Sequence, residues 1–341
     1  MTAPWPSNKI TANHLPNSRK AFGMPDNSEK TANFAGVEIA GTTMRAVIVS
    51  FDGTVVAQRQ VACQPNDLVP QIANLVSGLR ELGPIKSVGV GIPGLVNRET
   101  DRVLISTGLP SAVHGDFHSE LMKATGLRCE LENDANAAAY GEFIAGAGRD
   151  AHDIFYISIG DSIGGAILLN GKLWTGASGC AGEVGHITIN TEGTECVCGN
   201  TGCLETVASG PNIARRARER LDRDSTSSLS SLAKNENFTA ADLAHEATHG
   251  DDFSIMMIER TGKFIGAAVA SIINLLSIER IILGGGVMEA GELILNPIIE
   301  EAGKRSFQPC FDSTRIVAAE LGADGVAIGA ALLARDARGW E

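Results

Sequence analysis

Three cysteines and one histidine in the middle of the chain form a set of possible metal ligands. Cys196, Cys198 and Cys203 crowd into one short stretch, and His186 precedes them closely. Three thiolates and an imidazole are soft ligands of the kind that hold Zn²⁺ tetrahedrally in closed structural sites. The set therefore predicts a structural zinc ion, and three free thiols beside an unrelated histidine are the alternative. The other four cysteines stand alone in the sequence and are given no role.

Three glycine-containing turns could bind a nucleotide. Two lie between expected strands, and the third follows an expected strand and precedes a helix. Small residues in such turns let the backbone N–H groups approach phosphate closely, and a helix start adds favourable dipoles. Each turn alone is weak evidence, but three in this order are typical of a two-lobed nucleotide-binding fold. The candidate nucleotide contacts are Glu38, Gly41, Thr42, Thr43, Gly160, Asp161, Ser162, Gly164, Gly284, Gly285 and Gly286.

Asp134 stands where an expected strand meets an expected helix. Phosphoryl transfer to a hydroxyl needs a carboxylate within hydrogen-bond reach of that hydroxyl, acting as general base. Aspartate is also a favoured N-cap residue of helices, so the position by itself fits either role.

The elements that must position these residues follow from hydrophobic periodicity. Short β-branched runs separated by turns predict strands, and apolar residues at helical spacing predict helices. The expected strands are 36–39, 45–50, 54–62, 87–92, 153–159, 165–169 and 280–283, and the expected helices include 68–79, 253–276 and 325–338. This alternation predicts an α/β fold with two similar halves, and the last helix can pack on either of them.

Composition limits the classes of function. The chain has 341 residues, of which 44% are hydrophobic, enough for two lobes with large cores. A formal net charge of −12 argues against a nucleic-acid or anionic-membrane surface, so a small-molecule partner is expected. Residues 1–33 are rich in proline and polar residues and are expected to be a disordered tail. No apolar run resembles a signal peptide or a membrane span, so the cytoplasm is the expected location.

Four motifs resemble those of the ROK family (repressors, open reading frames, kinases). The resemblance covers about Phe34 to Ala334 and rests on Gly91-Ile-Pro-Gly94, Glu132-Asn-Asp-Ala-Asn-Ala-Ala-Ala139, Ala181-Gly-Glu-Val-Gly-His186 and Cys196-Val-Cys-Gly-Asn-Thr-Gly-Cys-Leu-Glu205. It implies two actin-like, ribonuclease H-like lobes with a cleft between them, over residues 34–133 and 134–341, with the zinc loop in the second lobe. It also implies Mg²⁺ and ATP as cofactors and Asp134 as the general base. The sugar-binding positions that it implies are Gly94, Ser106, Asn133, Asp134, Glu183, His186 and Glu205.

The sequence departs from the family pattern at the phosphate turns. The first turn of the family usually reads D-x-G-G-T-K, and here Glu38, Ala40 and Thr43 stand at its first, third and last positions. The second usually reads G-T-G-x-G, and here Asp161 and Ser162 replace the threonine and the second glycine. A carboxylate at 161 either recruits a cation or weakens ATP binding by repulsion. Residues 106–110 also lack the asparagine that often precedes Leu-Pro near the sugar, so the substrate need not be glucose.

The leading hypothesis is an ATP-dependent kinase that phosphorylates a primary hydroxyl of a hexose, an amino sugar or a hexose-like cyclitol. Its rival is a ROK-type sugar sensor or regulator that binds ligand without turnover, although residues 1–33 are too short and proline-rich for a helix-turn-helix. A zinc-stabilised structural protein ranks last because it leaves Asn133, Asp134 and the triple glycine unexplained. A homodimer is expected only because symmetric dimers are common among soluble enzymes.

Overall fold

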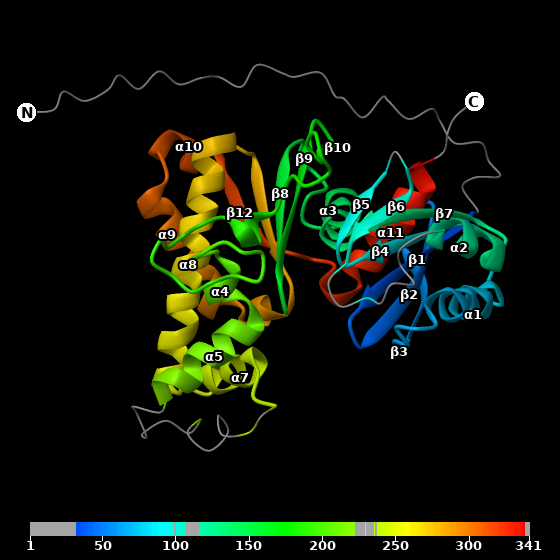
Figure 1. Ribbon diagram of the computed structural model, residues 1–341. Coiled ribbons are helices and arrows are strands. Elements are labelled where there is room, and N and C mark those ends of the chain that lie inside the picture. Colours follow the sequence, from blue (N-terminus) through cyan, green and yellow to red (C-terminus); the bar gives the residue numbers. More distant parts are fainter. Residues whose placement is uncertain are drawn as a thin grey trace, which may run out of the picture.

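The computed structural model describes residues 32–98, 100–106, 109, 116–221, 229, 235 and 237–337 (Figure 1). The expected tail, apart from its last two residues, lies outside the described residues, as does most of the polar stretch 225–237. The first strand already begins at Asn33. No helix within the described ranges combines the length and apolar character that a membrane crossing requires.

The first half of the chain forms a mixed five-stranded sheet. Its spatial order is β3-β2-β1-β4-β7, with strands Val55–Ala62, Thr43–Ser50, Asn33–Ala40, Ile85–Ile92 and Arg128–Asn133. The first three strands are antiparallel, and β4 and β7 run parallel to β1. Helices α1 (Leu68–Arg80) and α2 (Phe117–Thr125) cover its outer face, and β5 (Leu95–Asn97) pairs with β6 (Arg102–Ile105) in a small separate ribbon.

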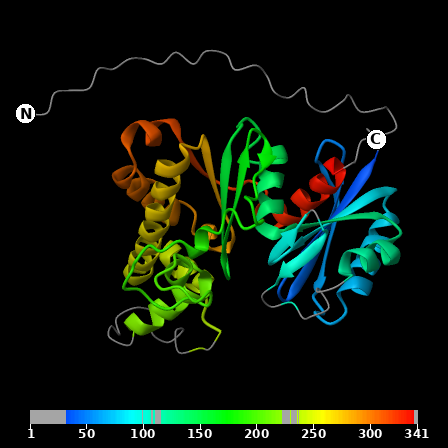
Figure 2. The ribbon, with the colours of Figure 1, turned by 45° about the horizontal axis from the view of Figure 1, so that its top comes forward.

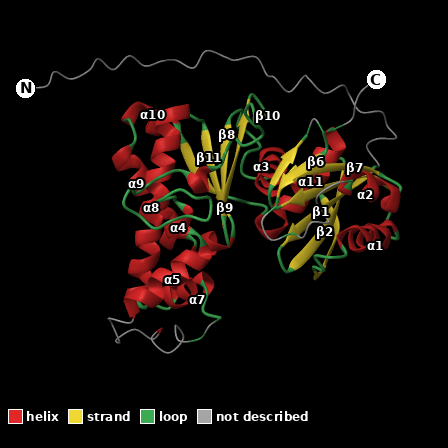
Figure 3. Cartoon of the chain, viewed as in Figure 1, coloured by secondary structure: helices red, strands yellow, loops and turns green. Residues whose placement is uncertain are grey.

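The second half repeats this sheet topology. Its order is β10-β9-β8-β11-β12, with strands Lys172–Leu173, Ile163–Leu169, Ile154–Ile159, Arg280–Gly284 and Arg315–Ala318. The long helix α8 (Asp252–Leu276) and α9 (Glu292–Arg305) cover its outer face, as Figure 3 shows. Besides two helices that pack between the sheets, the structure describes in this half α4 (Glu205–Ala208), α5 (Gly210–Leu221), α7 (Ala240–Thr248) and α10 (Gln308–Ser313), with short 3₁₀ turns at Val184–His186, Gly286–Ala290 and Gly322–Asp324.

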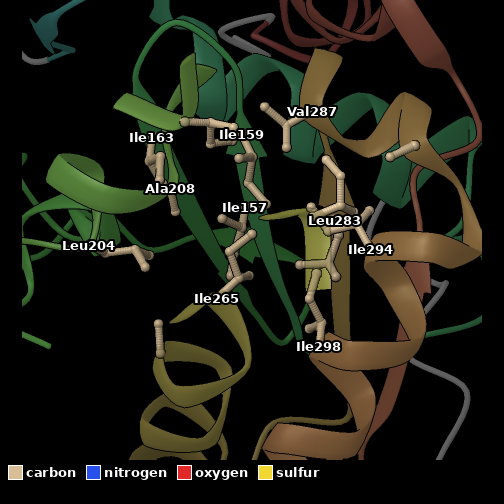
Figure 4. Packing of buried hydrophobic residues seen from close by; sticks show 14 of the residues in the cluster. Ile157, Ile159, Ile163, Leu204, Ala208, Ile265, Leu283, Val287, Ile294 and Ile298 are labelled. Atoms are coloured by element: carbon tan, nitrogen blue, oxygen red, sulfur yellow. The ribbon is translucent and has the colours of Figure 1, made fainter. Parts of the chain in front are cut away.

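Side chains of the second sheet alternate between its two faces, so each face contributes to a different hydrophobic core. Phe155, Ile157 and Ile159 of β8 face outward and pack with Ile265 of α8 and with α9, the packing drawn in Figure 4. The alternate residues of β8 face the other way and join the layer between the two sheets. Both faces of β8 are therefore apolar, which a central strand requires.

Helices α3 (Asp134–Ala145) and α11 (Gly325–Asp336) form that middle layer (Figures 1 and 2). The last helix lies against the first sheet, where Gly36 and Gly89 leave room for its backbone at Ala327 and Ala330. It crosses α3 at Gly329, where a Cβ atom would overlap the Ala137 carbonyl. Glycine at these crossings lets backbones approach more closely than any side chain allows. The middle layer thus ties the two halves together and carries Asp134 at its edge.

Candidate active site

Asp134 begins α3, and the residue before it is the helix cap. The Asn133 side-chain oxygen accepts a hydrogen bond from the Asn136 N–H at 3.0 Å, so Asn133 is the N-cap. The interpretation of Asp134 as an N-cap is therefore wrong, and its carboxylate is available for another role. Its Oδ1 accepts from the Ala135 N–H at 2.8 Å and from Asn133 Nδ2 at 3.0 Å.

Burial changes the acidity of Asp134. Burial is the main cause that raises its pKa from 3.8 to about 6. Two backbone hydrogen bonds lower the pKa in part, and the nearby Glu183 carboxylate raises it. A carboxyl group with a pKa near 6 is ionised at neutral pH and is a better proton acceptor than an ordinary aspartate.

Gly94, Ser106 and Asn133 lie together beside Asp134. Asn133 Nδ2 donates to the Gly94 carbonyl at 2.8 Å, and the Ser106 hydroxyl donates to the Pro93 carbonyl at 2.7 Å. Gly94 has φ of +142°, and a Cβ there would overlap the Ile105 carbonyl, so the turn requires glycine. Hydrogen bonds thus connect Asn133 to Gly94 and to Asp134, and Ser106 is bonded to the residue that precedes Gly94.

Glu183 and Glu205 come from the second half. The Glu183 carboxylate interacts with those of Asp134 and Glu205, and burial raises its pKa. Glu205 Oε2 accepts from the Ile163 N–H at 2.9 Å, and Ile163 lies within the second phosphate turn. This bond connects a predicted sugar-binding carboxylate to a predicted nucleotide loop.

The four predicted metal ligands do come together. Their ligand atoms all lie within 4.8 Å of one another, with Cys198 Sγ 3.8 Å from Cys203 Sγ and Cys196 Sγ 3.6 Å from His186 Nδ1. Tetrahedral bonds of about 2.3 Å to sulfur and about 2.0 Å to nitrogen give a sulfur–sulfur edge of about 3.8 Å and a sulfur–nitrogen edge of about 3.5 Å. The arrangement fits one zinc ion, and it leaves His186 Nε2 as the ring nitrogen that can meet a sugar hydroxyl.

The second and third glycine turns meet at the ends of β8 and β11. Gly285 has φ of +90°, and a Cβ there would overlap the Ile159 carbonyl, so only glycine fits. The Gly160 carbonyl accepts from the Gly210 N–H at 2.8 Å, which places the start of α5 beside these turns. A pocket of about 560 Å³ opens there and is lined by Gly160, Asp161 and Gly286 among the predicted residues.

Ser162, Gly164, Gly284 and Gly285 do not line this pocket. Gly164 lies instead against α3, since its Cβ would stand 3.2 Å from that of Ala135. Gly164, the last glycine of the second phosphate turn, therefore packs on the start of α3. Gly284 packs against the Tyr156 ring.

The first glycine turn lies on the other half, near Asp134. Gly41 has φ of +51° with open space around it, the Thr42 carbonyl accepts from the Cys63 N–H at 2.9 Å, and Thr43 is half-buried. Burial raises the pKa of Glu38 to about 7, and the Asp134 carboxylate contributes to that rise. The side chains of Glu38 and Asp134 therefore interact across the edge of the middle layer.

Sequence reasoning missed two parts of the site. Arg45, which pairs with Glu38 at 3.1 Å, was read only as a strand residue. The pocket walls along α5 and at the start of α7 were also missed, including Arg218 near the end of α5 and Phe238, whose guanidinium and ring stack at 5.4 Å. The Thr239-Ala-Ala-Asp242 capping box was the sequence signal for the start of α7.

Comparison with known proteins decides the family. Residues 34–337 match the sequence profile of the ROK family. The chain belongs to the ROK family. A glucokinase from Thermotoga maritima is 33% identical to it over 306 residues, which cover 88% of this chain and 96% of that protein.

Solved ROK structures share the fold. The ROK glucokinase from Streptomyces griseus in complex with glucose and AMPPNP has a TM-score of 0.80 at 30% identity, covering 89% of this chain and 100% of that one. A ROK transcriptional regulator, a homolog of the E. coli MLC protein, has a TM-score of 0.81 at 27% identity, covering 91% and 79%. The predicted α/β fold and the predicted ROK resemblance are confirmed. The family contains both kinases and regulators, so function must be argued from the site.

Proposed function

We propose that this ROK protein is an ATP-dependent sugar kinase in which Asp134 is the general base. One observation carries the proposal: Asp134 is not a helix cap, and its half-buried carboxylate, with a pKa of about 6, lies among the predicted sugar contacts. The kinase class is supported by similarity to glucokinases over most of both chains.

The sugar is proposed to bind between Gly94, Ser106 and Asn133 on one side and Glu183, His186 and Glu205 on the other. Carboxylates and amides suit a polyhydroxy ligand because they accept from and donate to hydroxyls in fixed geometry. In the reaction the sugar oxygen bonds to the γ-phosphorus, the bond from that phosphorus to the ADP oxygen breaks, and the hydroxyl proton passes to Asp134. A primary hydroxyl of a hexose, amino sugar or hexose-like cyclitol is the proposed acceptor.

ATP is proposed to bind across the glycine turns, with its adenosine in the pocket beside Gly160, Asp161 and Gly286. Its phosphates would extend toward Gly41, Thr42 and Thr43, past the second turn with Ser162 and Gly164 and the third turn with Gly284 and Gly285. Glu38 would supply a hard oxygen ligand of the kind that suits Mg²⁺, directly or through water. When bound, Mg²⁺ neutralises charge that develops on the phosphoryl group.

The Cys₃His cluster is proposed to hold a structural zinc ion. Its closed ligand set leaves no open position for catalysis. By fixing the segment 183–205, the zinc would orient Glu183 and Glu205 toward the sugar. We assign residues 34–133 to the first lobe and 134–341, including the zinc loop, to the second, although the last helix, α11, packs on the sheet of the first lobe. A cytoplasmic homodimer that binds neither nucleic acid nor membrane stays a prediction.

A sugar sensor without turnover is the second candidate, favoured by Ala40, Thr43 and Asp161 in the phosphate turns. Similarity to a ROK regulator supports it, but that regulator extends beyond the part that this chain covers.

One experiment separates the two candidates. Purified protein is incubated with Mg-ATP and a panel of hexoses, N-acylhexosamines, amino sugars and cyclitols, and ADP release is measured for each. We expect sugar-dependent ADP release with at least one member. Saturable binding of a panel member without any ADP release would instead establish the sensor.

A further inference from the structure

We infer that Arg45 is a positioning residue for phosphoryl transfer, holding the Glu38 carboxylate in place and supplying the positive charge that the family's first turn places at position 43. The inference rests on the proposed kinase function. Thr43 carries no charge, and side chains at positions 43 and 45 of a strand point to the same face of the sheet. Arg45 therefore places a positive charge on the same face of the sheet, two residues after position 43.

Strand register sets Arg45 directly opposite Glu38. The β1–β2 hairpin pairs Glu38 with Arg45 and Ala40 with Thr43, so both charged side chains lie on the face that meets the middle layer. Arg45 Nη1 donates to Glu38 Oε2 at 3.1 Å, and the two side chains are 21% and 15% exposed. A half-buried pair of this kind is screened less by solvent than a surface pair.

Arg45 also binds the segment that leads into α11. Its Nε lies 3.2 Å from Asp324 Oδ1, its Nη1 donates to the Ala323 carbonyl, and its Nη2 donates to Gln60 Oε1 at 3.2 Å. The planar guanidinium can hold several acceptors at once in fixed directions, which an ammonium group cannot. Arg45 thus joins β1, β3 and the entry to the helix that packs on α3, where Asp134 begins.

Charge explains why this contact matters for the reaction. Glu38 interacts with the carboxylates of Asp134 and Asp324, and together with burial they raise its pKa to about 7. Arg45 opposes that rise both by its charge and by its hydrogen bond. Without Arg45, Glu38 would be protonated over more of the neutral range and would lose the charge that a Mg-nucleotide requires.

The test compares Arg45→Met, Arg45→Gln and Arg45→Lys with the parent chain. We expect Arg45→Met and Arg45→Gln to lower kcat at pH 7 by about 10- to 100-fold and to weaken Mg-AMPPNP binding in calorimetry, with sugar affinity within about twofold. The acid limb of the kcat profile should move up by about one pH unit. Arg45→Lys keeps the charge but not the planar guanidinium, so it should return the acid limb toward its original position and restore only part of the loss in kcat.

Arg149→Met is the matched control, because Arg149 pairs with Glu320 at 2.9 Å on the exposed surface, with side chains 59% and 52% exposed. Arg149→Met should leave the acid limb of the kcat profile and the affinity for Mg-AMPPNP unchanged. An unmoved acid limb with intact Mg-AMPPNP binding in a folded Arg45→Gln protein overturns the inference. Failure of both uncharged variants to fold also overturns it, since the role is then purely structural. If the parent chain turns over no panel sugar, the proposed function fails, whatever the Arg45 variants do.

Discussion

Replacing Asp134 with asparagine should lower kcat strongly and stabilise the protein at the same time. Asparagine keeps the side-chain oxygen that accepts from Ala135 and Asn133, but it cannot take a proton from the sugar. Removal of a general base costs about 100- to 10,000-fold in kcat, and sugar affinity should fall far less because the shape is kept.

The gain in stability follows from the raised pKa of Asp134. Each pKa unit is worth about 1.36 kcal/mol, so the rise from 3.8 to about 6 corresponds to at most about 3 kcal/mol of instability while the carboxylate is charged. The folded protein binds the Asp134 proton more tightly than the unfolded chain does, so deprotonation of Asp134 destabilises the folded state. This loss of stability is complete above pH 6. Asp134→Asn should therefore unfold at higher denaturant concentration at pH 8, and the difference should shrink as the pH falls from 6 to 4.

The assay is a pair of measurements on one protein preparation. Steady-state kcat is measured on the best panel sugar, and denaturant unfolding is followed at pH 8 and pH 4. Asp116→Asn is the matched control, because Asp116 is exposed at the start of α2 and makes no capping bond. A near-wild-type kcat in Asp134→Asn would refute the role of Asp134 as general base. Equal stability of Asp134→Asn and the parent at pH 8 would refute the electrostatic argument.

Three further predictions use other parts of the structure. Purified protein should contain about one zinc per chain by elemental analysis. Cys198→Ser should lose the metal and much of the protein's stability. Cys180→Ser, which changes an exposed thiol outside the cluster, should lose neither. Glu38→Gln should lower kcat by at least about tenfold with sugar affinity nearly intact by calorimetry, and equal losses of both would contradict its place on the nucleotide side. Gly329→Ala should lower the free energy of unfolding by about 1–3 kcal/mol, because the new methyl group overlaps the Ala137 carbonyl, and an unchanged melting curve would contradict the close crossing.

Much of the fold could be predicted because its signals are local. The strands 87–92 and 280–283 are short apolar runs bounded by turns, and the structure places β4 and β11 there. The long helix predicted at 253–276 begins at Asp252 and ends at Leu276. The short strands β5 and β6 were not predicted, since three or four residues carry too little periodicity and their pairing depends on the surrounding fold.

The candidate site also contains residues that local sequence signals reveal and residues that only the tertiary packing brings together. The metal ligands were found because they are close in sequence, and their residue types are distinctive. The Glu38–Arg45 pair was missed although its signal was present, since a two-residue turn at Gly41 and Thr42 sets residue 38 opposite residue 45. The contact of Arg45 with Asp324 joins residues from opposite ends of the chain, and only the packing of α11 on the first sheet brings them together.

The burial of Asp134 also bears on the choice between kinase and sensor. A binding protein could hold a sugar hydroxyl at this position with an amide, which would make the same two bonds to Ala135 and Asn133 without a buried charge. The raised pKa corresponds to at most about 3 kcal/mol of instability for the charged carboxylate at neutral pH, and proton acceptance is the property that the amide lacks. If Asp134→Asn is more stable and binds sugar as well as the parent, the carboxylate contributes nothing to binding or folding. Its presence is then explained by turnover, and the sensor hypothesis loses its support at this residue.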